Sequence, residues 1–299
     1  MALAALSGDE QCIIFSQLCN VLDPGVAVGY GSTNSELRAL TQAQRQQLRA
    51  DHEAAAALCC DEAGMRSCKE LREAKEVEWN QEGLSATDLV TLGSMGSVLP
   101  ALEELYLREP TAGPDGVQRL AERLGAGALP AVVRFQISIM HVGDAGASAL
   151  AAALGRGALP RLKELHLTNA AIGDAGLVAL APALRRRPAL EAFGFGSNPF
   201  GDEGLAALVA PPPLPPAGAP PPPTGGLKKL KVLNLANAQI TDAGCAALAA
   251  ALDSGALPAL EDLYDTLYLH DIASAAAIDA VYMALAKSRA RVACFPQFL

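Results

Sequence analysis

Residues 159–184 read LPRLKELHLTNAAIGDAGLVALAPAL, and this stretch is the best guide to the fold. Leu165 and Leu167 alternate with polar side chains, a period of two that is typical of a strand with one buried face. After a Gly-Asp-Ala-Gly turn, apolar side chains recur at helical spacing over residues 177–184, and Asp174 is predicted to be the N-cap of that helix. A strand, a turn and a helix bury little alone, so this unit must stack on copies of itself.

Positions equivalent to Leu165 recur along the chain. They are Val77, Leu105, Phe135, Phe193, Leu233 and, in a last unit that is less clear, Leu263 or Leu267. From Val77 to Leu233 the steps are 28, 30, 30, 28 and 40 residues, and a leucine stands fifteen residues after each anchor in this span. Self-similarity at a nearly constant period of this size predicts a solenoid.

The opening L-x-x-L-x-L of each unit, the period and the alanine-rich helix after Gly-Asp-x-Gly resemble leucine-rich repeats of the ribonuclease-inhibitor type. The resemblance covers roughly residues 71–285. It implies an α/β solenoid, that is, a curved ribbon with parallel strands on the concave face, helices on the convex face and an N-terminal helical cap. Only Asn198 occupies the asparagine position that commonly follows the strand in such repeats, so a continuous asparagine ladder is not expected.

The sequence divides into a helical region, residues 1–70, and a repeat domain of about seven units, residues 71–299. Helices are predicted over residues 35–40 and 42–60, and a closing helix over residues 275–287. A proline-rich insertion, residues 211–226, interrupts the repeats and is predicted to run as polyproline II. The last unit is degenerate, because Asp265 stands where an inward leucine belongs.

Part of the helical region resembles an F-box. The matching positions are Leu6, Asp9-Glu10, Ile14-Phe15-Ser16, Leu18, Leu22-Asp23-Pro24, Ser32 and residues 36–40. The resemblance implies a surface of Ile14, Phe15, Leu18 and Pro24 that docks a Skp-type adaptor, while the repeats hold a substrate for ubiquitination. The sequence departs from the family at Ser7, where proline is usual. The alternative is a plain cap over the first repeat, with Phe15 buried near Trp79.

Composition limits the classes of partner. The net charge of −9 and the pI near 5.0 argue against nucleic acid and anionic membranes, whose binding needs clustered lysine and arginine. The short basic run Arg185-Arg186-Arg187 falls at a helix end, where we expect it to be solvated and to complement the helix dipole. We find no signal peptide and no bilayer-spanning segment, and seven cysteines without framework spacing predict a cytoplasmic or nuclear protein that is not secreted.

No pattern of catalytic, cofactor-binding or metal-ligating residues is found. Cys59-Cys60, Cys68 and His52 lack zinc-site spacing, and no histidine pairs with a nucleophile and a carboxylate. We therefore predict a protein that is not an enzyme and has no cofactor or metal. A further alternative comes from the Ran GTPase-activating proteins, whose repeats are related, with Arg108 and Arg134 as candidate arginines by location.

The main hypothesis is protein-protein interaction through the concave face, onto which alternate strand side chains point. Residue types that are enriched at protein interfaces gather in its N-terminal half. The candidate partner-binding residues are Glu78, Glu104, Tyr106, Arg108, Arg134, Gln136, Glu164 and His166. Beyond them, Gly194 and Gly196 are expected to leave a flat or dented floor.

Overall fold

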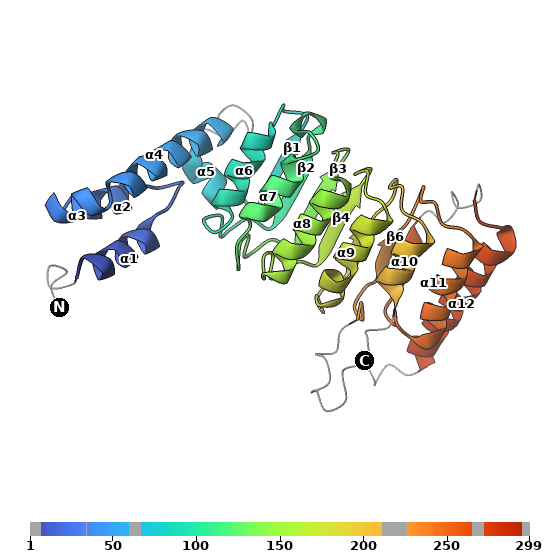
Figure 1. Cartoon of the computed structure of the whole chain (residues 1–299). Coiled ribbons are helices and arrows are strands. Elements are labelled where there is room, and N and C mark those ends of the chain that lie inside the picture. The colour runs from blue at the N-terminus through green and yellow to red at the C-terminus, as the bar shows by residue number, and fades with distance from the viewer. Residues whose placement is uncertain (1–6, 34, 60–66, 211–225, 265–271, 295–299) are drawn as a thin grey trace.

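The computed structural model describes residues 7–33, 35–59, 67–210, 226–264 and 272–294 (Figure 1). A group of helices comes first, and a ribbon of alternating strands and helices follows. The N-terminal helices are α1 (Gly8–Leu18), α2 (Gly25–Tyr30), α3 (Ser35–Leu40), α4 (Gln42–Ala57) and α5 (Cys68–Glu73). The strands are β1 (Glu76–Asn80), β2 (Glu104–Arg108), β3 (Arg134–Ser138), β4 (Glu164–Thr168), β5 (Ala192–Gly194), β6 (Val232–Asn234) and β7 (Asp262–Tyr264). The helices of the ribbon are α6 (Ala86–Met95), η3 (Pro110–Ala112), α7 (Gly116–Arg123), α8 (Gly143–Gly155), α9 (Asp174–Arg185), α10 (Asp202–Val209), α11 (Asp242–Ser254) and α12 (Ala275–Cys294).

The described strands form one seven-stranded parallel sheet in the order β1 to β7. One row of apolar side chains crosses the sheet in register, and it consists of Val77, Leu105, Phe135, Leu165, Phe193, Leu233 and Leu263. These are the anchors predicted from the sequence, so the register prediction is confirmed. In the last unit Leu263 continues the row, whereas Leu267 lies outside the described residues.

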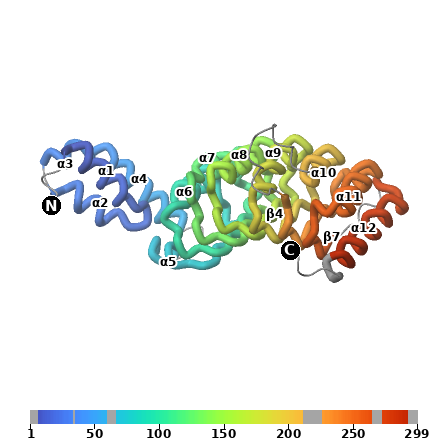
Figure 2. The backbone as a smooth tube through the Cα atoms, turned by 90° about the horizontal axis from the view of Figure 1, so that it is seen from below, coloured from blue at the N-terminus to red at the C-terminus, as the bar shows by residue number. Residues whose placement is uncertain are grey.

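The strands line one side of the ribbon and the helices line the other, and the ribbon curves toward its strand side (Figure 2). One continuous apolar cluster fills the space between the two layers from the first unit to the last. The leucines that follow the anchors by fifteen residues all lie in it, and they are Leu92, Leu120, Leu150, Leu180, Leu208 and Leu248. Helix α12 closes the ribbon at the predicted start, Ala275, but continues past the predicted end to Cys294. The α/β solenoid predicted from the sequence is confirmed.

An aspartate in one repeat unit accepts hydrogen bonds from the N-terminal end of the helix in the next unit. Asp174 is not the N-cap of its own helix, since Gly173 occupies that place. Instead, Asp174 Oδ1 accepts hydrogen bonds from the backbone N–H groups of Gly201 (2.8 Å) and Gly204 (2.7 Å) in the following unit. The same kind of bond to the unit ahead is made by Asp144, Asp202 and Asp242. The predicted N-cap role was wrong, because stacking brings the unsatisfied donors of the neighbouring helix to this carboxylate.

At the C-terminal ends of the helices, arginines donate hydrogen bonds to carbonyl oxygens of a neighbouring unit. Arg187 donates to three carbonyl oxygens of the preceding unit at 2.6 to 2.7 Å. Arg185 donates to the carbonyl oxygen of Ala207 in the following unit. Burial lowers the pKa of both guanidinium groups. The predicted solvated run is therefore wrong for these two arginines, although both still complement helix C-termini, and Arg186 is exposed as predicted.

Two buried polar side chains take the place of an asparagine ladder. Asn198, which is 1% exposed, accepts hydrogen bonds from backbone N–H groups of the preceding turn, at Ala170 and Ile172. Glu109, also 1% exposed, accepts them in the same way from the N–H groups of Glu82 and Gly83. Each satisfies turn donors that would otherwise be buried without a partner.

The N-terminal arm, residues 7–59, projects from the first end of the ribbon (Figures 1 and 2). Its outer part has a small core of Phe15, Ala27 and Leu48. Its inner part joins the core of the ribbon through Leu22 and Leu58, so this part covers the first repeat as a cap does. The predicted helix over residues 35–40 and the start of the one at residue 42 are confirmed, but α2 was not predicted.

Candidate functional site

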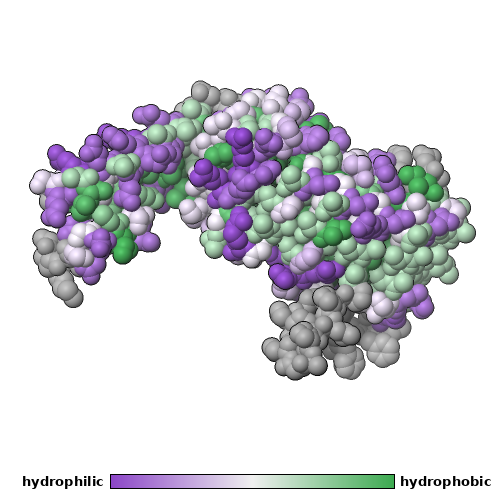
Figure 3. All heavy atoms as spheres, in the orientation of Figure 1, coloured by the Kyte–Doolittle hydropathy of each residue, from purple (hydrophilic) through white to green (hydrophobic). Residues whose placement is uncertain are grey.

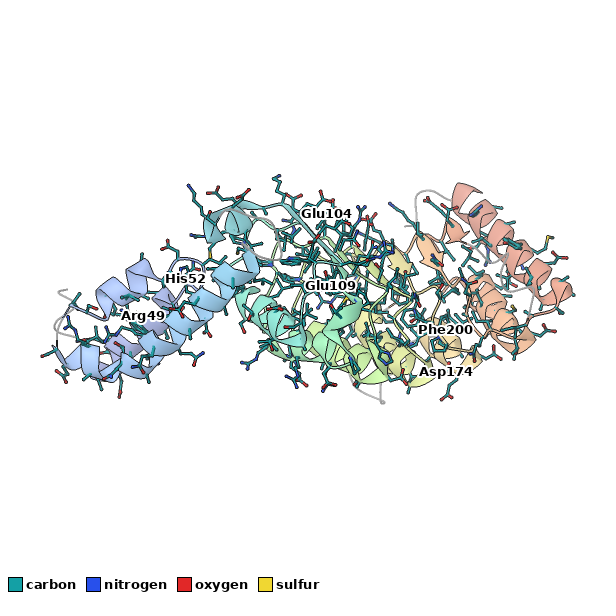
Figure 4. All side chains as sticks on the ribbon, turned by 90° about the horizontal axis from the view of Figure 1, so that it is seen from above. Arg49, His52, Glu104, Glu109, Asp174 and Phe200 are labelled. Carbon is teal, nitrogen blue, oxygen red and sulfur yellow. The ribbon has the colours of Figure 1, made fainter. Side chains whose placement is uncertain are left out.

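All eight predicted partner-binding residues lie on the strand face that points away from the helices. Side chains alternate between exposed and buried along β1, and between half-buried and buried along β2, β3 and β4. Two rows cross these strands in register, Glu78–Tyr106–Gln136–His166 and Glu104–Arg134–Glu164, and Arg108 ends β2. Figure 4 shows Glu104 on this side of the ribbon and Asp174 on the helix side.

Arg134 is the centre of a hydrogen-bonded group that we call the Arg134 cluster, made of Arg134, Glu104, Tyr106, Glu164 and His166. The guanidinium group donates to Glu164 through Nε (2.7 Å) and Nη2 (3.2 Å), a two-point contact. Its Nη1 donates to Glu104 (2.9 Å) and to the Tyr106 hydroxyl (3.0 Å), and that hydroxyl donates to Glu104. The Nε2 atom of His166 lies 3.7 Å from the Glu164 carboxylate. The charged groups of the cluster therefore bind one another across three strands.

The environment of the cluster shifts the pKa values of its members. The hydrogen bonds from Arg134 lower the pKa of Glu164 and so keep it ionised. Burial lowers the pKa of His166 and outweighs the nearby Glu164 carboxylate, so the imidazole is neutral near pH 7. Burial also raises the pKa of Tyr106, which stays protonated. The cluster is a set of fixed donors and acceptors in which no group is poised to transfer a proton at neutral pH.

The glycines of β5 and the following loop do not leave a dent. The ring of His166 occupies the place that a side chain at Gly194 would fill. The amide oxygen of Asn234 lies 2.8 Å from where a methyl group at Gly196 would be. Both glycines thus make room for polar side chains of neighbouring strands, and the expected flat or dented floor is wrong.

A second group of charges on this face has no partner. Within the described part of the chain, the side chains of Glu76, Glu78 and Arg108 make no hydrogen bond or ion pair, and the buried Nε of Arg108 is unsatisfied. The two glutamates are exposed and Arg108 is half-buried. The two arginines, which the sequence did not distinguish, therefore differ in the structure. The guanidinium group of Arg134 binds two carboxylates and a hydroxyl group, whereas that of Arg108 binds none within the described residues.

A shallow depression lies at the edge of the sheet where the strands end. It is lined by Pro110, Ile139, Met140, His141, Asn169, Ala171, Ser197 and Pro199. Ile139 is 39% exposed and has a φ of 55°, a left-handed conformation that is strained for a β-branched residue. Sequence analysis missed this residue. The signal was present, since the equivalent left-handed positions at Asn169, Ser197 and Asn237 carry small polar side chains that suit such a turn.

The predicted adaptor-binding residues are less accessible than an F-box docking surface requires. Phe15 is fully buried, and Ile14, Leu18 and Pro24 are half-buried. Phe15 packs in the outer core of the arm and not in the cluster that contains Trp79, so its predicted burial near Trp79 is also wrong. The exposed apolar side chains of the arm are instead Ile13, Val26 and Leu40. Figure 3 shows hydrophobic atoms on the arm among hydrophilic ones.

Neither a metal site nor a membrane-spanning helix is found in the described ranges. No group of three or more histidine, cysteine, aspartate or glutamate residues there is arranged to hold a metal ion. None of the helices in those ranges combines the length and the apolar character that crossing a membrane requires.

The sequence and the fold were compared with known proteins. Two stretches, residues 159–181 and 226–249, match the leucine-rich repeat family, and they cover β4 with most of α9 and β6 with most of α11. No curated protein matches the sequence. Among solved structures, an internalin (inlF) from Listeria monocytogenes is 13% identical with a TM-score of 0.22, and the match covers 56% of this chain and 62% of that one. The two matched repeats lie within a seven-stranded parallel sheet backed by helices, so the chain has the fold of a leucine-rich repeat solenoid.

Proposed function

We propose that this protein is a non-enzymatic interaction module that binds a protein partner on the concave face formed by β1 to β4. The proposal rests on one observation, that some charged side chains on this face are paired and others are not. The charged groups of the Arg134 cluster are paired with one another, one arginine with two glutamates, whereas Glu76, Glu78 and Arg108 present charges with no partner in the described part of the chain. Arginine and tyrosine are enriched at protein interfaces, so Arg108 and Tyr106 are the candidate anchors of this face.

The Arg134 cluster supports this proposal as a rigid platform. Its ion pairs are about one-third exposed, so each contributes roughly 0.2–1 kcal/mol to stability at most. Their main effect is to hold Tyr106 in one orientation, which reduces the entropy lost when a partner packs on it. In the described part of the chain, His166 has no hydroxyl or thiol as a hydrogen-bond partner, which favours binding over nucleophilic catalysis.

A capture experiment with surface variants tests the proposal. Proteins retained from a cell lysate by the wild-type chain are compared with those retained by the double variant Glu78→Lys, Tyr106→Ala. Glu203→Lys makes the same charge change on the exposed helix side and is the control. We expect a set of proteins that the wild type and the control retain and the double variant loses. Identical sets for all three chains would contradict a concave-face site.

A second candidate function, that of an F-box-type substrate receptor in a cullin-based ubiquitin ligase, is favoured by the position and surface of the arm. The arm extends away from the ribbon and exposes Ile13, Val26 and Leu40. Binding of a purified Skp-type adaptor tests it, with the double variant Ile13→Asp, Val26→Asp against Arg49→Asp, a charge change at an exposed position of α4. Adaptor binding that only the first variant loses would support the ligase role, and no binding by the wild type would exclude it.

The Ran-type GTPase-activating alternative is weakened by the saturation of Arg134. A guanidinium group that already donates to Glu104, Tyr106 and Glu164 is not available to a GTPase. This leaves only Arg108 of the two arginines considered. We also propose a cytoplasmic or nuclear location, which the free thiols of Cys12, Cys19, Cys68 and Cys245 support.

A further inference from the structure

We propose that Arg108 receives a carboxylate from the protein partner, and that the depression beside it takes an apolar side chain adjacent to that carboxylate. The proposal rests on the proposed concave-face function and specifies the chemistry that the partner must carry. The occupant is an acidic segment of a protein with an aspartate or glutamate next to an apolar residue.

Arg108 and Arg134 occupy the same face on adjacent strands but differ in their partners. Arg134 lies between Glu104 and Glu164 in its row, and both carboxylates bind it. Arg108 lies in register with Asn80, and no carboxylate within the described residues binds its guanidinium group. The Nε atom of this half-buried guanidinium group is buried and has no acceptor, so part of the group has lost hydration without compensation. An incoming carboxylate would bind the terminal N–H groups, whose planar fork matches its two oxygens.

The depression lies close to Arg108, because residues that follow β2 and β3 directly form part of its lining. Pro110, two residues after Arg108, forms part of its lining, and so does Ile139, which follows β3 directly. The backbone N–H of Ile139 donates to the carbonyl oxygen of Thr168 at 3.1 Å, and this bond holds the left-handed turn that presents the isoleucine. An apolar side chain kept exposed at the cost of backbone strain is a feature often found at binding sites. The apolar and cationic contacts thus lie at one edge of the sheet.

The charges around Arg108 favour a carboxylate over a phosphate. Glu78 on the adjacent strand β1 and Glu82 just after that strand are exposed, and the chain carries a net charge of −9. A phosphate group carries close to two negative charges at pH 7 and is usually bound by several basic groups. The concave strand positions of β1 to β4 offer one unengaged guanidinium group within the described residues, which matches a single negative charge.

A random twelve-residue peptide library displayed on phage tests the proposal with the intact chain. We expect the wild type to enrich peptides with an aspartate or glutamate beside an apolar residue. Arg108→Gln should bind a selected peptide at least about tenfold more weakly, the loss of one charge-assisted contact. Arg186→Gln, the same change at an exposed arginine at the end of α9 and outside the concave face, should still select acidic peptides. Arg108→Glu should instead enrich basic peptides.

Several outcomes would overturn the proposal. Enriched peptides without acidic residues, no enrichment at all, or equal binding by Arg108→Gln would each do so. A phosphoserine in place of the acidic residue that tightens binding more than tenfold would assign the site to phosphate. Unchanged fluorescence of Trp79, whose strand pairs with β2, confirms that each variant is folded. Loss of the peptide preference with the lysate partners retained would refute this inference and leave the proposed function standing.

Discussion

Leu165 represents the residues on which the ribbon depends. Its side chain is 2% exposed and belongs to the apolar row that crosses all seven described strands. The next residue, His166, points to the other face and is only half-buried. Of these two adjacent side chains, the first therefore packs in the core and the second lies at the surface.

Leu165→Asp should unfold the ribbon. A buried carboxylate without a partner costs several kcal/mol, which is comparable to the whole stability of a domain of this size. Circular dichroism and urea titration would show loss of the cooperative transition. His166→Ala is the neighbouring control and should change the free energy of unfolding by about 1 kcal/mol or less. A large loss of melting temperature in the control would contradict the strand register.

Acidification should destabilise the protein through His166 and then through Glu164. The folded-state pKa of His166 lies below its ordinary value of 6.5, so its contribution is present above pH 6.5 and is lost as pH falls below it. The folded-state pKa of Glu164 lies below 4.5, and its contribution is lost as pH falls below that value. Urea midpoints measured from pH 8 to well below pH 4.5 test this. His166→Gln should flatten the curve just below pH 6.5, and an unchanged curve would assign that slope to other groups.

At the scale of elements, the helices are joined at both ends by side chains that reach across to a neighbouring unit. Aspartates bind the N–H groups at helix N-termini, and arginines bind the carbonyl oxygens at helix C-termini. Both kinds of bond satisfy backbone groups that a helix cannot satisfy internally. Adjacent units are therefore coupled by polar contacts as well as by the apolar core.

Asp174→Ala should lower the free energy of unfolding by about 1–3 kcal/mol, because two N–H groups of α10 lose a charged acceptor. Asp115→Ala is the matched control. Asp115 occupies the N-cap of α7 but makes no capping bond, and its contact with Arg119 is exposed at 3.9 Å, so its loss should cost about 0.5 kcal/mol or less. Equal effects of the two substitutions in urea unfolding would refute the inter-unit role.

At the scale of the molecule, the outer part of the arm has a small hydrophobic core that is separate from the core of the ribbon. Phe15 packs in the outer core of the arm, whereas Leu22 and Leu58 pack in the core of the ribbon. Nearest-neighbour contacts dominate in a solenoid, so damage to one end need not spread to the middle. The outer arm is expected to open independently of the repeats.

Phe15→Ala should therefore loosen the arm alone. Removal of a buried phenylalanine costs about 3–5 kcal/mol, which is as much as a small hydrophobic core usually supplies in total. Hydrogen exchange measured by mass spectrometry should show faster exchange over α1 to α3 and unchanged protection of β3 and β4. Leu58→Ala is the comparison, since it also removes contacts to the first repeat and should lower protection in β1. Uniform loss of protection in Phe15→Ala would show that arm and ribbon unfold as one unit.

The sequence by itself determined the repeat, the strand register and the face on which each strand side chain lies. This was possible because the spacing of apolar residues records local geometry, and Leu105, Phe135 and Leu165 recur at the 30-residue interval that separates neighbouring strands. The pairing partners of polar groups depend instead on contacts between residues about thirty positions apart. Only the tertiary structure decided that Asp174 caps the next helix, that Arg134 is saturated while Arg108 is open, and that Phe15 is buried within the arm. Stacking sets these partners, and no local pattern encodes them.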